Sequence, residues 1–301
     1  MKFCRPFSLG ELLSLVGYNN DFNGDADSAV YGFSDDFFAQ KGDITWTENV
    51  HVLKRLLSLE HSLTIITNHP VDSKFVNKNV ICCANPLRLF ETIVDSAYFT
   101  STKENKIGKN TFIHDTVCIG NNVKIGDNCS LSPNVVIGDN VIVGNNVTIE
   151  PFTIIGNTPY YTLWDQNKRL RNRKIYGNVI IKDNVSIGSF CSIDNGITCE
   201  TIIGSGSKLG NYVEIGHDVK VGNNCCFAAQ TAIAGYVSIG NDCVFWAKSG
   251  VSNRIQIAPH TTLLASSILT KSVSASGLTL CGFPAIDRIK YWKKYSHKHN
   301  E

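Results

Sequence analysis

The sequence predicts a mainly β protein in which a parallel β-helix follows a small α/β domain. Three observations carry this prediction. An apolar residue recurs at every sixth position across most of residues 107–269, glycine often comes directly after it, and residues 1–100 lack the repeat. The repeated residues form three runs: Ile107, Ile113, Ile119, Ile125, Leu131, Ile137, Val143, Ile149 and Ile155; then Ile181, Ile187 and Ile193; then Ile203, Leu209, Ile215, Val221, Phe227, Ile233, Ile239, Phe245, Val251, Ile257, Leu263 and Leu269.

A period of six fits neither an α-helix, which repeats its apolar face about every 3.6 residues, nor a half-buried strand, which repeats it every second residue. It is typical of a parallel β-helix, in which short strands alternate with turns and each repeated residue points into one shared core. Three repeats close one triangular coil, and we expect neighbouring coils about 4.8 Å apart. Glycine or asparagine after the repeated residue suits the turns, because both accept backbone conformations that β-branched residues resist.

The regions outside the repeat define the domain organisation. Residues 1–100 are the predicted α/β domain, residues 101–285 are the β-helix, with an inserted loop at 157–178, and residues 286–301 are a short basic helix or tail. In the first domain the segments SLGELLSLVG and PLRLFETIVDSAYF predict helices, and VLKRLLSLEHSLTIIT predicts a helix that runs into a buried strand.

The composition excludes several classes of protein. With 43% hydrophobic residues and 28 basic against 26 acidic side chains, the chain is neither disordered nor charged like a nucleic-acid binder. No apolar stretch is long enough for a membrane span or a signal peptide. Eleven cysteines without a CxxC pair indicate free thiols in a reducing compartment, so we expect a cytoplasmic protein.

The inserted loop combines aromatic and basic residues. It carries Tyr160, Tyr161 and Trp164, followed by Lys168, Arg169, Arg171, Arg173 and Lys174. Long insertions in a repeat array usually lie on one face, which is often the binding face. The loop is either a solvated charged segment or an electropositive guide for phosphates or an acidic carrier protein.

One histidine stands out against the repeat. His217 lies two residues after Ile215, at a turn, and 18 residues later the same position of the next coil holds Gly235. Acyl transfer needs a general base near neutral pKa and a donor for the tetrahedral oxyanion, and a histidine beside a residue without a Cβ offers both. An inert surface histidine is the alternative. The remaining histidines form no coil-spaced set, so we expect no metal site.

The hexads, the segment NYVEIGHDVKVGNN and the closing CGFPA resemble the left-handed β-helix acyltransferases built from hexapeptide repeats. Within that superfamily the chain resembles the UDP-3-O-acylglucosamine N-acyltransferases of lipid A synthesis. The resemblance implies a left-handed β-helix, His217 as general base and Gly235 as oxyanion donor. It also implies that Asn211 and Glu214 lie in the same cleft and contact the substrates, although ordinary turn polarity explains both equally well.

Further residues follow from the same resemblance. In the first domain, GFSDDFFAQKGDITWTEN is similar to the family's uridine-binding segment, so Trp46 is the expected base-stacking aromatic and Asn49 a nucleotide contact; a core position is the alternative for Trp46. Val52 replaces a second aromatic. Arg254 stands where the family often has a second active-site histidine, and Tyr160 and Tyr161 replace part of a Gly-Phe-Gly-Tyr stretch. We therefore expect Arg254, Tyr160 and Tyr161 to bind the acyl donor.

The expected activity is transfer of an acyl group from acyl carrier protein or acyl-coenzyme A to the amine of a UDP- or dTDP-linked amino sugar, by a homotrimer without a bound cofactor. Two alternatives remain open. One is an acyl-coenzyme A enzyme that modifies a dideoxy amino sugar for surface polysaccharide. The other is a catalytically silent scaffold that binds a sugar nucleotide.

Overall fold

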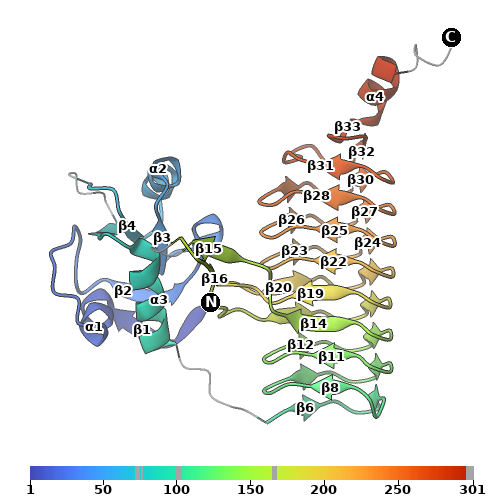
Figure 1. Ribbon diagram of the computed structural model, residues 1–301, viewed down its shortest axis with the longest axis horizontal. Helices are drawn as coiled ribbons and strands as arrows, with labels where there is room; N and C mark the ends of the chain where they lie inside the picture. The colour runs from blue at the N-terminus through green and yellow to red at the C-terminus, as the bar shows by residue number, and fades with distance from the viewer. Residues whose placement is uncertain (72–74, 76, 99–103, 165–167, 296–301) are drawn as a thin grey trace. The chain divides into compact units, whose positions relative to one another are not determined.

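The computed structural model describes residues 1–71, 75, 77–98, 104–164 and 168–295. The chain divides into two compact units, residues 1–101 and residues 102–301 (Figure 1). The first contains most of the helices, and the second is a stack of triangular coils. The predicted fold class, a mainly β chain with a parallel β-helix and a small α/β region, is confirmed.

The N-terminal unit is a five-stranded sheet with helices. Its strands are β1 (Lys2–Ser8), β2 (Ala29–Phe33), β3 (Asp43–Thr47), β4 (Leu63–Thr67) and β5 (Lys78–Cys82), and its helices are α1 (Leu9–Leu15), η1 (Asp36–Phe38), α2 (Val50–Ser58) and α3 (Pro86–Ala97). The strands lie in sequence order; β1 and β2 pair antiparallel and the other neighbours pair parallel. Helix α1 begins with the expected capping box, in which Ser8 and Glu11 exchange hydrogen bonds. Helices α1 and α3 fall within the predicted segments, and α2 begins at Val50, two residues before its predicted segment.

The second unit has three flat faces, each a parallel sheet of very short strands. Face 1 contains β6 (Lys106–Ile107), β9 (Lys124–Ile125), β12 (Ile142–Val143), β17 (Val179–Ile181), β20 (Thr201–Ile203), β23 (Lys220–Val221), β26 (Ser238–Ile239) and β29 (Gln256–Ile257). Face 2 contains β7 (Phe112–Ile113), β10 (Ser130–Leu131), β13 (Thr148–Ile149), β18 (Ser186–Ile187), β21 (Lys208–Leu209), β24 (Cys226–Phe227), β27 (Val244–Phe245), β30 (Thr262–Leu263), β32 (Thr279–Cys281) and, antiparallel at its end, β33 (Ile286–Asp287). Face 3 contains β8 (Cys118–Ile119), β11 (Val136–Ile137), β14 (Ile154–Asn157), β19 (Ser192–Asp194), β22 (Glu214–Ile215), β25 (Ala232–Ile233), β28 (Gly250–Val251) and β31 (Ile268–Leu269).

The repeated apolar residues fill one continuous core between the faces. Those from Ile125 to Leu269 are buried, whereas Ile107 is 44% exposed because it belongs to the first coil, which no coil covers from below. The strand register is 18 residues in the regular coils, as where Ile119 pairs with Ile137. Two coils are longer: Ile155 pairs with Ile193, across the insertion, and Ile193 pairs with Ile215, across the ten-residue step.

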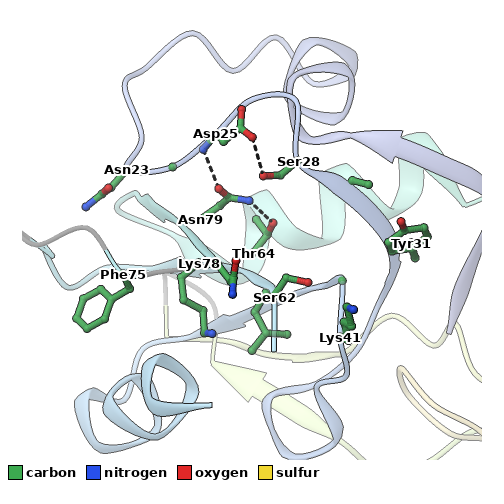
Figure 2. Close-up of a pocket in the computed structure, with 15 residues that line it drawn as sticks. Asn23, Asp25, Ser28, Tyr31, Lys41, Ser62, Thr64, Phe75, Lys78 and Asn79 are labelled. Atoms are coloured by element: carbon green, nitrogen blue, oxygen red, sulfur yellow. Dashed lines mark hydrogen bonds between the residues drawn. The ribbon is translucent and has the colours of Figure 1, made fainter. Parts of the chain in front are cut away.

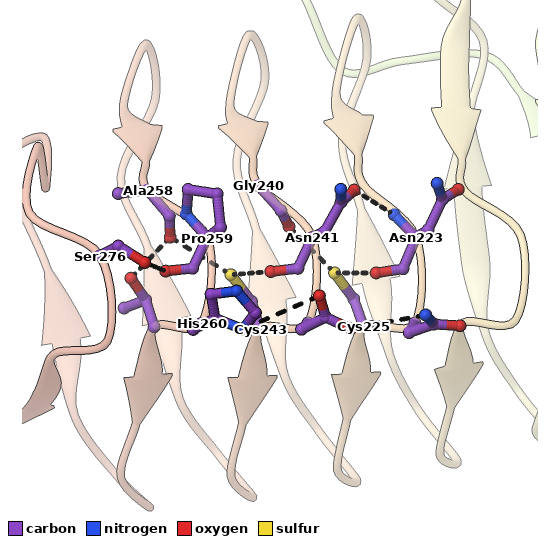
Figure 3. Close-up of polar contacts among 12 residues, drawn as sticks. Asn223, Cys225, Gly240, Asn241, Cys243, Ala258, Pro259, His260 and Ser276 are labelled. Carbon is purple, nitrogen blue, oxygen red and sulfur yellow. Dashed lines mark hydrogen bonds and ion pairs between the residues drawn. The ribbon is translucent and has the colours of Figure 1, made fainter.

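Polar ladders hold the turns of the regular coils together (Figure 3). The side-chain oxygen of Asn241 accepts a hydrogen bond of 2.9 Å from the backbone N–H of Asn223, one coil below. The thiols of Cys225 and Cys243 are buried beside this ladder and donate to the carbonyl oxygens of Asn223 and Asn241. Such contacts satisfy backbone groups that the short strands leave unpaired.

Two further elements extend the solenoid. The insertion forms a hairpin of β15 (Thr162–Trp164) and β16 (Leu170–Asn172), and the basic C-terminal segment forms α4 (Arg288–Tyr295). No helix in the described part of the chain is long and apolar enough to cross a membrane.

Candidate active site

His217 lies at the corner where the chain turns from face 3 to face 1, between β22 and β23. Its side chain is 12% exposed, and it is followed by Asp218, whose backbone is left-handed at φ 58°. We call this turn and the equivalent turn of the next coil (residues 216–219 and 234–237) the site corner.

Asp218 holds the imidazole from its buried side. The carboxylate is fully buried and lies 3.0 Å from His217 Nδ1. It also accepts hydrogen bonds from the backbone N–H groups of Ile197 (2.8 Å) and Cys199 (2.9 Å), with Thr198 at 3.3 Å. An ionised carboxylate only accepts hydrogen bonds, so it fixes the proton of a neutral imidazole on Nδ1 and leaves Nε2 with a lone pair. His217 is therefore oriented as a base.

The donors to Asp218 come from the irregular coil. Residues 197–199 belong to the ten-residue step between Ile193 and Ile203, where the chain bulges and presents three successive N–H groups to one carboxylate. Sequence reasoning did not assign Asp218 a role. The signal was available, because an acidic residue follows the histidine and the only ten-residue step lies one coil below it.

Gly235 faces the imidazole directly. A Cβ built on it would lie 2.4 Å from both Cε1 and Nε2 of His217, so no larger residue fits without displacing the ring. Among the described residues none accepts a hydrogen bond from the Gly235 N–H. A Cβ on Gly216 would lie 2.9 Å from that nitrogen, so the second glycine also keeps it accessible. The structure thus brings together the imidazole and the amide that the spacing predicts as neighbours.

Both groups open onto a cleft of about 420 Å³ on face 3. Small and apolar residues form its wall, and the acidic side chains of Asp194 and Glu214 also line it. The wall residues include Ala232, Ala234, Gly250, Val251 and Ile268. Burial raises the pKa of Asp194 to about 6, and the Glu214 carboxylate adds to the rise. Two carboxyl groups beside the imidazole suit a substrate that carries an amine.

Aromatic rings contact the imidazole from two elements. Tyr161 of the insertion lies 5.3 Å from His217 between ring centroids, and Tyr236 of the site corner lies 4.9 Å away; both meet it edge to face. The guanidinium of Arg173 lies over Tyr161 at 5.6 Å, and that of Arg254 lies over Tyr236 at 4.5 Å. Each ring therefore links a cation to the imidazole.

Some of the other predicted site residues lie at the cleft or contact the imidazole, and others do not. Glu214 and Tyr160 line the cleft with His217 and Gly235, and Tyr161 contacts the imidazole. Asn211 does not line the cleft: it lies at the preceding corner, between faces 2 and 3, where its side-chain oxygen accepts a hydrogen bond from Ser189 N–H. This placement matches the turn-polarity alternative.

The predicted nucleotide residues belong to the N-terminal unit. Trp46 is half-buried on β3, beside Ile66 of β4, and Asn49 is the N-cap of α2, where its oxygen accepts from His51 N–H and Val52 N–H. Neither lines the pocket of about 420 Å³ in this unit (Figure 2). Hydrogen bonds inside the unit already engage polar side chains of that pocket, since Lys78 donates to the carbonyls of Leu59 and His61.

The described residues contain no group of histidine, cysteine and carboxylate side chains that could hold a metal ion.

Comparisons with known proteins agree with this architecture. Residues 106–139 and 200–235 match the family model "Bacterial transferase hexapeptide (six repeats)", and the second range contains the site corner up to Gly235. UDP-3-O-acylglucosamine N-acyltransferase 1 of Sulfurimonas denitrificans is 37% identical over 134 residues, 44% of this chain and 42% of that protein. The enzyme of the same name from Campylobacter jejuni subsp. doylei is 44% identical over 134 residues, 44% of this chain and 42% of that protein. The chain thus spans less than half the length of the curated relatives it matches.

A solved structure gives a likeness over a larger share of the chain. A UDP-N-acetylglucosamine acyltransferase from Bacteroides fragilis superposes with a TM-score of 0.55 at 25% identity and covers 64% of this chain and 73% of that one. The second unit is a parallel β-helix with the hexapeptide repeats of bacterial transferases, and the chain resembles the UDP-3-O-acylglucosamine N-acyltransferases.

Proposed function

We propose that this protein is an N-acyltransferase that moves an acyl group from a thioester donor to the amine of a nucleotide-linked amino sugar. The observation that carries the proposal is the imidazole of His217, held by buried Asp218 and packed beside Gly235 at the edge of a cleft. The names of the relatives support the choice of a sugar nucleotide as acceptor.

In the proposed reaction, the sugar ammonium first loses one proton to solvent, and Nε2 of His217 then takes a second proton from the neutral amine while the nitrogen attacks the thioester carbonyl carbon. The carbonyl oxygen becomes an oxyanion, and the N–H of Gly235 donates a hydrogen bond to it, a contribution of about 3 kcal/mol by analogy with other such donors. The intermediate collapses to an amide and expels the sulfur, which leaves as a thiol after it receives the proton from His217. Asp218 stabilises the imidazolium between the two proton transfers.

Asp194 and Glu214 give the cleft its preference for an amine. An amino sugar is largely an ammonium ion at neutral pH, and two carboxyl groups in the same cleft would attract that cation and orient its nitrogen beside Nε2 of His217. This arrangement favours N-acylation over acylation of a hydroxyl group, which carries no charge for the carboxylates to bind.

The donor would lie along the apolar wall of the cleft. Residues Ala232, Gly250 and Ile268 follow one another up face 3, so an extended chain could run past several coils and place its thioester at the site corner. Exposed Tyr160 would contact the arm at the rim. Both acyl carrier protein and acyl-coenzyme A present such an arm.

The nucleotide would bind to the N-terminal unit. Trp46 would stack on the base, and Asn49, whose oxygen caps α2, would contact the base through its amide nitrogen. The base is uracil or thymine in this proposal.

We also propose a homotrimer. The cleft of a single solenoid is open on one side, and a second copy against face 3 would close it. Light scattering should give three times the chain mass of 33.1 kDa, whereas a monomer would contradict the assembly.

The decisive experiment incubates the protein with UDP- and dTDP-linked amino sugars and offers acyl-coenzyme A and acyl carrier protein in separate reactions. Mass spectrometry should detect an amide product from at least one pair. The variant His217→Ala should lose between about 100-fold and 10,000-fold in kcat without a change in oligomeric state. A protein that binds the sugar nucleotide but forms no product with any donor would be the silent scaffold.

A further inference from the structure

Three residues of consecutive coils form a column beside the imidazole. They are Asp218, Tyr236 and Arg254, which occupy the same turn position of successive coils. All three have left-handed backbones, with φ of 58°, 60° and 59°. The register of face 3, in which Ile215 pairs with Ile233 and Ile233 with Val251, stacks these positions directly. Left-handed backbone is costly for tyrosine and arginine, so the turn itself does not favour them here.

The side chains of the column connect to His217 in two ways. Asp218 is hydrogen-bonded to Nδ1, and the buried ring of Tyr236, which is 1% exposed, meets the imidazole edge to face at 4.9 Å. The guanidinium of Arg254 lies 4.5 Å from the centre of the same tyrosine ring. Tyr236 and Arg254 are not among the residues that line the cleft. Arg254 therefore reaches the site through the ring and not through the cleft.

We infer that Arg254 is a positioning residue for the reaction, which holds Tyr236 against the imidazole and places a positive charge behind it. This inference rests on the proposed function and differs from the expectation that Arg254 contacts the donor. A guanidinium pairs with an aromatic face through its planar shape as well as its charge, so lysine is a poor substitute. The ring in turn limits the rotation of the imidazole, so that Nε2 stays at the Gly235 amide.

The charge of Arg254 also opposes the acidic groups around His217. Three carboxyl groups face or bind the imidazole and favour its protonated form: Asp218, Asp194 and Glu214. Two guanidiniums oppose them, Arg254 through Tyr236 and Arg173 through Tyr161; the two phenols are neutral near pH 7. Cations near the imidazole oppose the attraction that carboxylates exert on an imidazolium, and only a neutral imidazole can act as a base.

Kinetics of Arg254→Gln separates positioning from donor binding. We expect kcat to fall about tenfold with both acyl-coenzyme A and the corresponding acyl-pantetheine, which lacks the nucleotide phosphates, while KM for each donor stays within about twofold. Arg254→Lys should recover less than half of the lost kcat. Lys248→Gln removes a cation from an exposed turn residue of the same coil with the same φ of 60°, and should change neither constant. A rise of about tenfold in KM for acyl-coenzyme A alone would overturn the inference and make Arg254 a phosphate contact.

A second measurement does not depend on activity. Proton–carbon NMR of the histidine Cε1–H groups, with the His217 signal assigned from His217→Asn, gives the pKa of His217 in each variant. Loss of the Arg254 charge should raise this pKa by about half a unit, and Lys248→Gln should leave it unchanged. If the wild type lacks acyl transfer but the pKa shifts, the proposed function fails and the coupling stands; if the pKa does not move, the coupling itself is wrong.

Discussion

The regular coils and the site coil use the same turn position for different purposes. In several regular turns the residue after the glycine is Asn or Asp, and its side chain caps a backbone N–H of the coil below: Asp139 accepts from Asn121 N–H, and Asn241 accepts from Asn223 N–H. At the site corner the equivalent pair is His217 and Gly235, and Gly235 has no side chain to cap anything. Gly235 therefore offers no side chain to the N–H of His217 in the coil below, and the imidazole of His217 lies in the space that such a side chain would fill.

The difference indicates that the site forms where the repeat lacks a side chain, at Gly235; we call this a site made by omission. The coils provide backbone N–H groups at their corners, and in several turns a polar side chain of the next coil accepts from them. Glycine at position 235 therefore leaves the N–H of His217, one coil below, without a side-chain cap and makes room for the imidazole, and the strand pairing of faces 1 and 3 continues in register. Asp218 then recruits the bulged residues 197–199, which turns an irregular coil into the support of the base.

Of the substitutions discussed here, a side chain at position 235 should have the largest combined effect on kcat and stability. Gly235→Ala places a methyl group 2.4 Å from His217 Nε2, so the imidazole must move away from the amide, and kcat should fall about 100-fold. Overpacking should also cost about 1–3 kcal/mol of unfolding free energy, measured by urea denaturation.

The three atoms nearest to the new methyl group all belong to the imidazole, and this allows a sharp control. In a His217→Ala background the same substitution should cost less than about 1 kcal/mol, because the clashing ring is gone. An equal cost in both backgrounds would mean that the backbone, and not the histidine, requires glycine.

Asp218→Asn tests the support of the base. The amide keeps the shape of the carboxylate but turns one acceptor oxygen into a donor, which faces either backbone N–H groups or Nδ1 of His217. We expect kcat to fall about 100-fold, since the preferred tautomer of the imidazole is lost, and stability to fall by about 2 kcal/mol. The matched control is Asp242→Asn, an acidic residue at the same turn position of a regular coil, 44% exposed near His260. It should change stability by less than about 0.5 kcal/mol, and a loss as large as that of Asp218→Asn would remove the distinction between the two coils.

Asp194→Asn should produce a pH-dependent effect. Burial raises the pKa of Asp194 to about 6 in the folded protein, above its unfolded value near 3.8. Between these values the folded state binds more protons than the unfolded state, so this residue makes stability fall as the pH rises from about 4 to about 6. Relative to the wild type, the Asn variant should therefore gain about 1–2 kcal/mol between pH 4 and pH 7 in urea denaturation. A difference that stays constant over this range would show that Asp194 titrates normally.

The fold could be predicted from the sequence more fully than the site. The hexads place Ile215, Ile233 and Val251 in register, so the adjacency of His217 and Gly235 follows from counting residues. Asp218 and Asp194 act through burial, which depends on how the ten-residue step folds, and the repeat carries no information about a step that departs from it. The contacts of Tyr161 and Arg173 come from the insertion, whose path over the coils has no periodicity to reveal it.

The smallest expected effect belongs to the regular ladder. Asn241→Ala removes the side-chain acceptor of Asn223 N–H (2.9 Å) and leaves the strands in place, so it should cost about 1 kcal/mol of unfolding free energy. Because Asn241 lies at the corner between faces 1 and 2 and does not line the cleft, kcat should stay within about 20% of the wild type. Asn241 and the site corner thus lie at equivalent turns of the repeat but have different roles. If Asn241→Ala lowered kcat as much as it lowered stability, the corners would be mechanically coupled along the coil, and a site made by omission would depend on the ladders that surround it.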